Sequence, residues 1–277
     1  MPRLREDQWR WGLILGVPIM RSEPSLLKGE GEAEIRLPLL GEGRRRLGSY
    51  PEMDRSTARS MTYRALSQGY IHPDQEVYAW IMGGEWLVEM REALELLEGK
   101  NFQEHLSSLE QVIHGAYKEH HQEMISEYAR LFLASPLRAG ISPYGSIYFA
   151  QRGLQPNIRE IVHFYHEAGF ALRESLRDHP DHIAHELEFM GMLAGKETSA
   201  SAQEKIRLEE IQMHFLSRFI FPWVPLFCEK VIQETRSLFY RSLSSLTDEF
   251  ILFDRNYLGV PEESDGLEAV RFDHRER

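Results

Sequence analysis

The chain has 277 residues, of which 42% are hydrophobic and 27% charged, a composition typical of a soluble globular protein and not of a disordered one. Its 43 acidic residues outnumber the 32 basic ones and give a formal net charge of −11 at pH 7. Such a chain lacks the basic surface that non-specific nucleic-acid binding requires, so we expect no nucleic-acid partner.

The sequence also argues against membrane insertion and export. The longest apolar stretch near the N-terminus, Trp11 to Met20, is about half as long as a membrane-spanning helix requires. Glu6 and Asp7 stand where a secretory leader would be basic. The single cysteine, Cys228, cannot form an internal disulfide and lies in an apolar run, which is typical of a small buried side chain. We therefore expect a cytoplasmic protein with no membrane span.

The two ends of the chain lack a periodic apolar pattern. Residues 1–49 are rich in glycine and proline, as in Gly29 to Gly31 and Gly41 to Gly43, and are predicted to form an irregular N-terminal extension. Residues 254–277 are polar and contain glycine, and are predicted to form a polar C-terminal tail.

Between these ends, residues 50–253 carry apolar residues at helical spacing. The first stripe follows Asp54, a suitable helix cap, and ends at Gly69. Further helices are predicted at 87–97, 106–117, 124–132, 158–169, 180–194 and 208–219, and a last one from about Pro222 through Leu243. No alternating strand pattern occurs from 54 to 253, so the sequence predicts an all-α protein with a single helical-bundle domain.

The densest group of polar side chains runs from Asp178 to Glu186. On a helix beginning at Pro180, the side chains of His182, His185 and Glu186 would share one face, which allows a metal site in a helical-bundle enzyme. The spacing of zinc proteases is absent, and the glutamate–histidine spacing that a di-iron bundle needs twice occurs only once, from Glu160 to His163. The same residues also suit a plain helix start, in which Asp181 complements the helix dipole.

A second candidate is the loop from Ser142 to Tyr148, which places Tyr144 and Tyr148 near Pro143. Such a loop can present aromatic rings to an extended peptide, or it can pack as a connector at the end of the bundle. The residues alone leave both interpretations open.

Four segments, by their order and spacing, resemble the TorD/DmsD/NarJ family of redox-enzyme maturation chaperones over roughly residues 55–253. They are Tyr128-x-x-Leu131-Phe132, the Ser142 to Tyr148 loop, Tyr165-x-x-x-Gly169-Phe170, and the run that begins Pro180-Asp181-His182-Ile183 and ends at Leu193. The resemblance implies a non-enzymatic, all-helical cytoplasmic chaperone with no cofactor of its own. It would bind the catalytic subunit of a molybdenum enzyme, often at a twin-arginine leader, until that enzyme receives its molybdopterin cofactor. The family's binding region corresponds here to Pro143, Tyr144, Asp181 and His182.

A twin-arginine leader offers two guanidinium groups followed by an apolar segment. Its receptor therefore needs carboxylates beside an aromatic groove. The candidate carboxylates are Asp178, Asp181 and Glu186, and the candidate apolar contacts are Tyr144, Tyr148 and Phe189. The alternative function is a metal-dependent enzyme that uses His182, His185 and Glu186.

We predict that removal of Met1 to Gly48 leaves the thermal unfolding midpoint nearly unchanged, because this segment has no periodic apolar face to bury. Circular dichroism melting of the full and shortened chains measures the effect. A clear drop in the midpoint would mean that the extension packs on the bundle.

Overall fold

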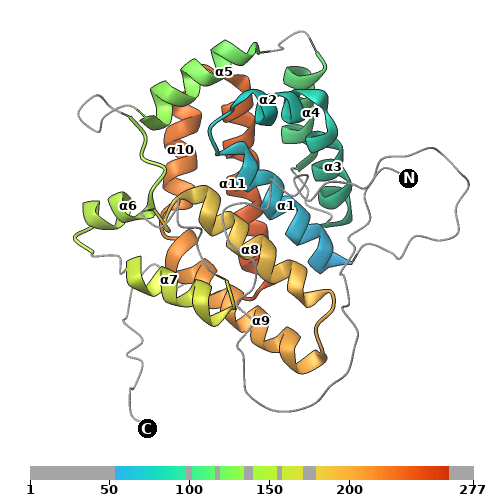
Figure 1. The fold of residues 1–277 in the computed structure, drawn as a ribbon, viewed down its shortest axis with the longest axis vertical. Coiled ribbons are helices and arrows are strands. Elements are labelled where there is room, and N and C mark those ends of the chain that lie inside the picture. The colour runs from blue at the N-terminus through green and yellow to red at the C-terminus, as the bar shows by residue number, and fades with distance from the viewer. Residues whose placement is uncertain are drawn as a thin grey trace, which may run out of the picture.

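The computed structural model describes residues 54–97, 102–115, 119–133, 140–154, 158–170 and 179–261 (Figure 1). Within these ranges every named element is helical, which confirms the all-α prediction. The α-helices are α1 (Arg55–Gly69), α2 (Gln75–Gly83), α3 (Glu85–Leu97), α4 (Phe102–Ile113), α5 (His121–Tyr128), α6 (Gly145–Gln151), α7 (Ile158–Glu167), α8 (Ile183–Glu197), α9 (Ala202–Phe215), α10 (Val224–Glu234) and α11 (Leu238–Tyr257). Two π-helical turns, η2 (Ala129–Leu133) and η5 (Leu216–Ile220), follow α5 and α9. The predicted N-terminal extension lies outside the described residues.

Helix α1 begins as predicted and organises the bundle. The Asp54 carboxylate caps it by accepting a hydrogen bond of 2.7 Å from the Thr57 backbone N–H. Its buried face packs mainly against α8 and α3, while α11 packs between α4 and α10 (Figure 1). At Gly69 an added Cβ would come within 2.7 Å of the Leu243 side chain, so the absence of a side chain lets α1 approach α11 closely.

The predicted last helix is in fact two helices, and that prediction is wrong. The chain breaks between α10 and α11 at Thr235 to Ser237. The Glu127 carboxylate accepts hydrogen bonds from the Thr235 hydroxyl (2.9 Å) and the Arg236 N–H (2.7 Å). Glu119 accepts from the hydroxyl of Ser237, which caps α11. These polar contacts come from a distant part of the chain and hold a turn that the apolar pattern alone does not reveal.

Three further features differ from the sequence prediction. Helix α11 continues to Tyr257, so the boundary of the C-terminal tail at 254 is wrong, and Asp254 is fully buried. Helices α2 and α6 were not predicted, because stretches of nine and seven residues show too little apolar periodicity. The tail residues beyond Pro261 lie outside the described ranges.

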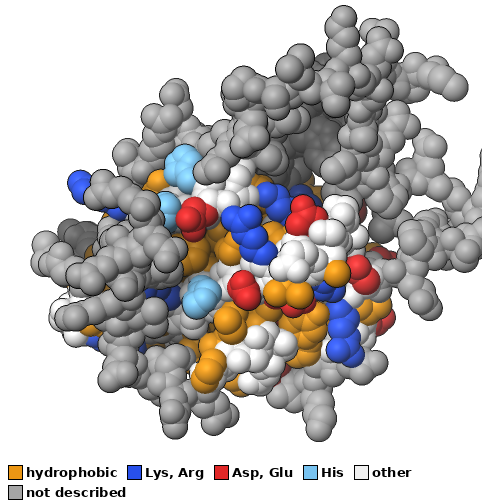
Figure 2. All heavy atoms as spheres, turned by 90° about the horizontal axis from the view of Figure 1, so that it is seen from below, with side chains coloured by type: hydrophobic (Ala, Val, Ile, Leu, Met, Phe, Trp, Pro, Cys, Tyr) orange, Lys and Arg blue, Asp and Glu red, His pale blue; other side chains and the backbone are white. Residues whose placement is uncertain are grey.

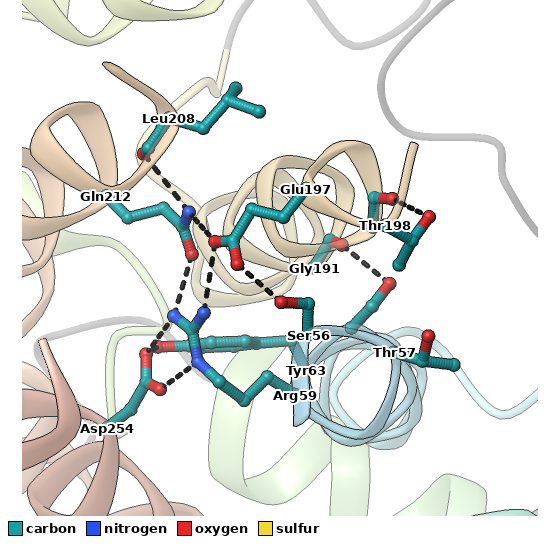
Figure 3. Close-up of polar contacts among 12 residues, drawn as sticks. Ser56, Thr57, Arg59, Tyr63, Gly191, Glu197, Thr198, Leu208, Gln212 and Asp254 are labelled. Atoms are coloured by element: carbon teal, nitrogen blue, oxygen red, sulfur yellow. Dashed lines mark hydrogen bonds and ion pairs between the residues drawn. The ribbon is translucent and has the colours of Figure 1, made fainter. Parts of the chain in front are cut away.

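A buried ion cluster joins four helices (Figure 3). The Arg59 guanidinium of α1 donates to both carboxylate oxygens of Asp254 in α11, at 2.5 and 3.0 Å, and to Glu197 of α8 at 3.2 Å. It also donates to the amide oxygen of Gln212 in α9 at 2.7 Å, and the Tyr63 hydroxyl donates to Asp254 at 2.6 Å. Burial would lower the pKa of Arg59, but attraction to Asp254 outweighs it and holds that pKa above its ordinary value. The guanidinium is therefore charged, buried and paired with two carboxylates.

The surface mixes apolar and charged side chains. Figure 2 views the molecule from the end where α7 and α9 lie, and shows hydrophobic side chains among acidic, basic and histidine ones. Exposed apolar residues of these two helices include Ile158 and Ile206, the latter 52% exposed. Among the described residues, no helix has both the length and the hydropathy that crossing a bilayer requires.

We predict that Asp254→Ala lowers the free energy of unfolding by about 3–5 kcal/mol, because it leaves the Arg59 charge buried with an incomplete set of partners. Glu110→Ala is the matched control. It breaks an exposed ion pair with Arg91 and should cost less than about 1 kcal/mol. Urea denaturation monitored by circular dichroism measures both variants, and similar small losses would contradict a central role for the cluster.

Candidate functional site

Two loops that are distant in the sequence lie side by side. The Ile183 N–H donates to the Pro143 carbonyl (2.9 Å), and the Gly145 N–H donates to the Asp181 carbonyl (3.0 Å). These bonds form an isolated antiparallel bridge between Tyr144 and His182. The proline-tyrosine loop and the Asp-His loop therefore form one continuous surface, where α6 and α8 begin.

Asp181 caps the neighbouring helix rather than its own. Its side chain is 2% exposed, and its carboxylate accepts a hydrogen bond of 2.9 Å from the Ser146 N–H in the first turn of α6. The predicted helix start at Pro180 is wrong, because α8 begins at Ile183 with His182 as its cap. Pro180 instead lies in the preceding turn, where its carbonyl accepts from the Tyr165 hydroxyl at 2.8 Å.

Three imidazole rings and one phenol ring gather at this surface. Tyr144 lies 4.8 Å from the ring of His179 and 5.2 Å from that of His182, which in turn lies 5.4 Å from His185. The Nδ1 atom of His182 accepts from the Ala184 N–H, so its proton is on Nε2. The Nδ1 atom of His185 lies 2.7 Å from the His179 carbonyl, which can only accept, so this Nδ1 carries the proton.

The two capping-region histidines are uncharged at neutral pH. Burial, followed by the neighbouring His185 and His179, lowers the pKa of His182 to about 3. Burial lowers the pKa of His185 to about 4. A cationic ligand would therefore meet neutral imidazole rings here and no repelling charge.

Beneath the surface lies a second group of contacts centred on Trp223. The indole N–H donates to Oε2 of Glu186 at 3.1 Å, and the Tyr148 ring lies 5.2 Å from the indole ring. Gly145 lies against the indole, where an added Cβ would come within 2.9 Å of Nε1. Burial, and then the nearby Asp181, raise the pKa of Glu186 well above its ordinary value, which favours the uncharged form of the carboxyl group.

The structure separates the eight predicted binding residues into groups. Pro143, Tyr144, Asp181 and His182 meet at the bridged loops, while Tyr148 and Glu186 lie beneath them and meet at Trp223. Phe189 is fully buried between Tyr165 and Phe215, and Asp178 lies outside the described residues. Of the seven described ones, Tyr144 and His182 are partly exposed and the rest are buried. A role for any of them in binding stays a prediction.

Some donor atoms of the alternative metal site already form hydrogen bonds. The Nδ1 atoms of His182 and His185 bind backbone groups, and Oε2 of Glu186 binds Trp223. Within the part of the chain that the structure describes, no three side chains of His, Cys, Asp or Glu are grouped to hold a metal ion. The geometry of these residues gives the metalloenzyme hypothesis no support.

Sequence reasoning did not identify His179 and Trp223 as residues of the site. His179 directly precedes the Pro-Asp-His run. Its contact with Tyr144 depends on the pairing of the two loops, which the sequence does not reveal. Trp223 follows Glu186 by 37 residues, and no local spacing links them. Gly145 is the residue that the close approach of Trp223 requires, but helix α6, which it begins, was itself not predicted.

We predict that the two neutral histidines make the protein less stable at mildly acidic pH. Their folded pKa values of about 3 and about 4 lie below the ordinary 6.5, so the unfolded chain binds more protons below about pH 6.5. The contribution of the two neutral histidines to the free energy of unfolding is fully present above about pH 6.5 and is lost as the pH falls toward 4. The slope is at most about 1.4 kcal/mol per pH unit for each histidine.

His182→Asn tests this, because asparagine keeps a capping acceptor and does not titrate. Between pH 7 and pH 4.5 the variant should lose about 1–2 kcal/mol less unfolding free energy than the unchanged protein, measured by urea denaturation. His163→Asn, an exposed histidine on α7, is the control and should follow the unchanged protein. If the unfolding free energies of all three proteins fall in parallel as the pH is lowered, the lowered pKa of His182 is contradicted.

Comparisons with known proteins agree with the sequence resemblance. Residues 98–229 match the family model described as "Nitrate reductase delta subunit". The chaperone protein TorD of Vibrio atlanticus is 29% identical and that of Photobacterium profundum 30% identical, each over 139 residues that cover 49% of this chain. The alignments span 64% of each TorD protein's length.

The perchlorate reductase assembly chaperone protein of Dechloromonas aromatica is 27% identical over 205 residues, which cover 72% of this chain and 89% of that protein. These matches confirm that the chain is similar to the TorD/DmsD/NarJ family of redox-enzyme maturation chaperones.

Proposed function

We propose that this protein is a non-enzymatic cytoplasmic chaperone. It binds the catalytic subunit of a molybdopterin-containing oxidoreductase and assists cofactor insertion and assembly before the client is exported. The similarity to this family supports the role, because the relatives are named as TorD chaperones and as an assembly chaperone for perchlorate reductase. Among the described residues, no group of His, Cys, Asp or Glu side chains is placed to hold the metal ion that a metalloenzyme would need.

The observation that carries the proposal is the bridge between Tyr144 and His182. It brings together the two motifs that the family resemblance associates with client binding. Helix capping fixes both loops, since Asp181 caps α6 and His182 caps α8. A preformed, partly exposed aromatic surface suits an extended peptide, because little conformational entropy is lost when the peptide binds.

The ligand of this surface is a twin-arginine leader. Guanidinium groups stack favourably on phenol and neutral imidazole rings, which Tyr144 and His182 supply. Ile147, one turn further along α6, is 39% exposed and offers apolar contact for the segment that follows the arginines. The net charge of −11 attracts a cationic peptide over a longer range.

Affinity purification of the full chain from its native cells, with mass spectrometry of co-purifying proteins, tests the function. We expect the full chain to co-purify with the large catalytic subunit of a molybdopterin oxidoreductase, a subunit that carries a twin-arginine leader. Recovery of that subunit should fall several-fold with Tyr144→Ala. It should be unchanged with Tyr78→Ala, which removes a comparably half-buried tyrosine from α2.

Calorimetry with the synthetic leader of the captured subunit then tests the ligand. Replacement of both leader arginines by alanine should weaken binding about tenfold or more, since charge-assisted and stacking contacts are lost. The proposed surface would be contradicted if the Tyr144→Ala variant captured the subunit as well as the unchanged protein. It would also be contradicted if replacing the leader's arginines left the affinity unchanged. Failure to capture any molybdopterin enzyme subunit would contradict the chaperone function itself.

A further inference from the structure

Two buried polar atoms beside Trp223 have no hydrogen-bond partner among the described residues. They are the Tyr148 hydroxyl oxygen and Oε1 of Glu186. Their side chains are 4% and 1% exposed, and both contact the same indole ring, Tyr148 by ring packing and Glu186 through its other oxygen. Buried polar groups are nearly always paired in folded proteins, so two unpaired ones around one ring indicate a site that accepts a polar group from a ligand.

A cation already covers one face of this site. The Lys230 ammonium lies 4.8 Å from the centre of the Tyr148 ring. Lys230 projects from the exposed side of α10, and its side chain is long and flexible. It can therefore leave the ring at little cost when a better-matched cation arrives.

We propose that Tyr148, Trp223 and Glu186 form an inner subsite for an arginine side chain of the client peptide, and that Lys230 covers this subsite until the peptide binds. This inference rests on the proposed chaperone function and extends it beyond the bridged loops. The guanidinium donates to Oε1 of Glu186 and to the Tyr148 oxygen, and it takes the place of Lys230 over the aromatic ring.

The chemistry of the subsite favours arginine over lysine. A guanidinium is planar, presents five N–H donors, is weakly hydrated and stacks on aromatic rings, whereas an ammonium is a compact, strongly hydrated charge. The hydrogen bond from Trp223 fixes the Glu186 carboxyl group and leaves Oε1 to face the incoming donor. Burial raises the pKa of Glu186 and so favours its uncharged form in the covered subsite, whereas an arriving guanidinium stabilises the ionised carboxylate.

The position of α6 explains how the bridged loops and the inner subsite belong to one surface. Gly145 begins α6 directly after Tyr144 and lies against the indole N–H edge. Tyr148 lies one turn further along the same helix and packs on the same indole. A peptide bound at Tyr144 thus lies about one helical turn from the Tyr148 ring that Lys230 contacts.

The test uses the full chain and an arginyl-arginine amide dipeptide as the probe. The readout is the indole N–H signal of Trp223 in proton–nitrogen correlation spectra, identified by its loss in Trp223→Phe. We expect the dipeptide to shift this signal, while that of Trp86, which is bonded to the Ala65 carbonyl in the core, stays in place. A lysyl-lysine amide dipeptide at the same concentration should shift the Trp223 signal less.

Three variants separate the subsite from general electrostatics. Glu186→Gln should lower the affinity for the dipeptide about tenfold, because a charge-assisted hydrogen bond is lost. Tyr148→Phe should weaken it about threefold without lowering the thermal midpoint, because the hydroxyl has no described partner to lose. Lys230→Ala should tighten binding about threefold, since a competing cation is removed. Lys205→Ala on α9 changes the net charge equally and should leave affinity unchanged.

Unchanged affinity in Glu186→Gln overturns the subsite, and so does an equal effect of Lys230→Ala and Lys205→Ala. A Trp223 indole signal that does not shift when the dipeptide is added also overturns the subsite. If this signal is silent while capture of a molybdopterin enzyme still depends on Tyr144, the subsite is wrong and the chaperone function stands. If the dipeptide binds as expected and no such enzyme is captured, the chaperone function is wrong and the subsite stands as an arginine-binding site.

Discussion

The pairing of one buried guanidinium with its partners sets the geometry of the bundle (Figure 3). A buried charge without partners is strongly destabilising, so Arg59 fixes α1 relative to Asp254 of α11 and Glu197 of α8 at the same time. Glu197 is the last residue of α8, and the capping His182 precedes its first. The ion cluster therefore anchors one end of a helix about 22 Å long whose other end carries the candidate site.

The free end of α8 is held by a different kind of contact. Asp181, just before α8, caps α6, and the backbone bridge joins the loops that lead into both helices. Each helix start thus satisfies donors or acceptors of the other, and neither loop can move without exposing unpaired backbone groups. Both loops nevertheless keep part of Tyr144 and His182 at the surface. The site is rigid where it is held by backbone bonds and adaptable where Lys230 covers Tyr148.

What the sequence could predict depended on how local each interaction is. Asp54 lies next to the helix that it caps, so the start of α1 was predictable. Asp254 looked like part of a polar tail, because its partner Arg59 lies 195 residues away. The break at Thr235 depends on Glu127, 108 residues earlier. Near α8, a proline suits either the first helical turn or the turn before it, and the hydrogen bond from Tyr165 to Pro180 selects the latter. The motif resemblance identified the two loops, but only the fold shows that they are bridged.

The location of the carboxyl groups bears on how the proposed chaperone releases its client. A receptor with exposed carboxylates would bind any arginine-rich peptide, whereas Asp181 and Glu186 are both buried and bonded here. At the proposed subsite an arginine displaces Lys230 from the Tyr148 ring and binds a carboxyl group whose pKa is raised by burial, and both effects subtract from the net binding free energy. The resulting affinity is lower than the contacts alone would give. Moderate affinity combined with a demanding geometry suits a protein that must recognise a leader specifically and then give it up once the client is assembled.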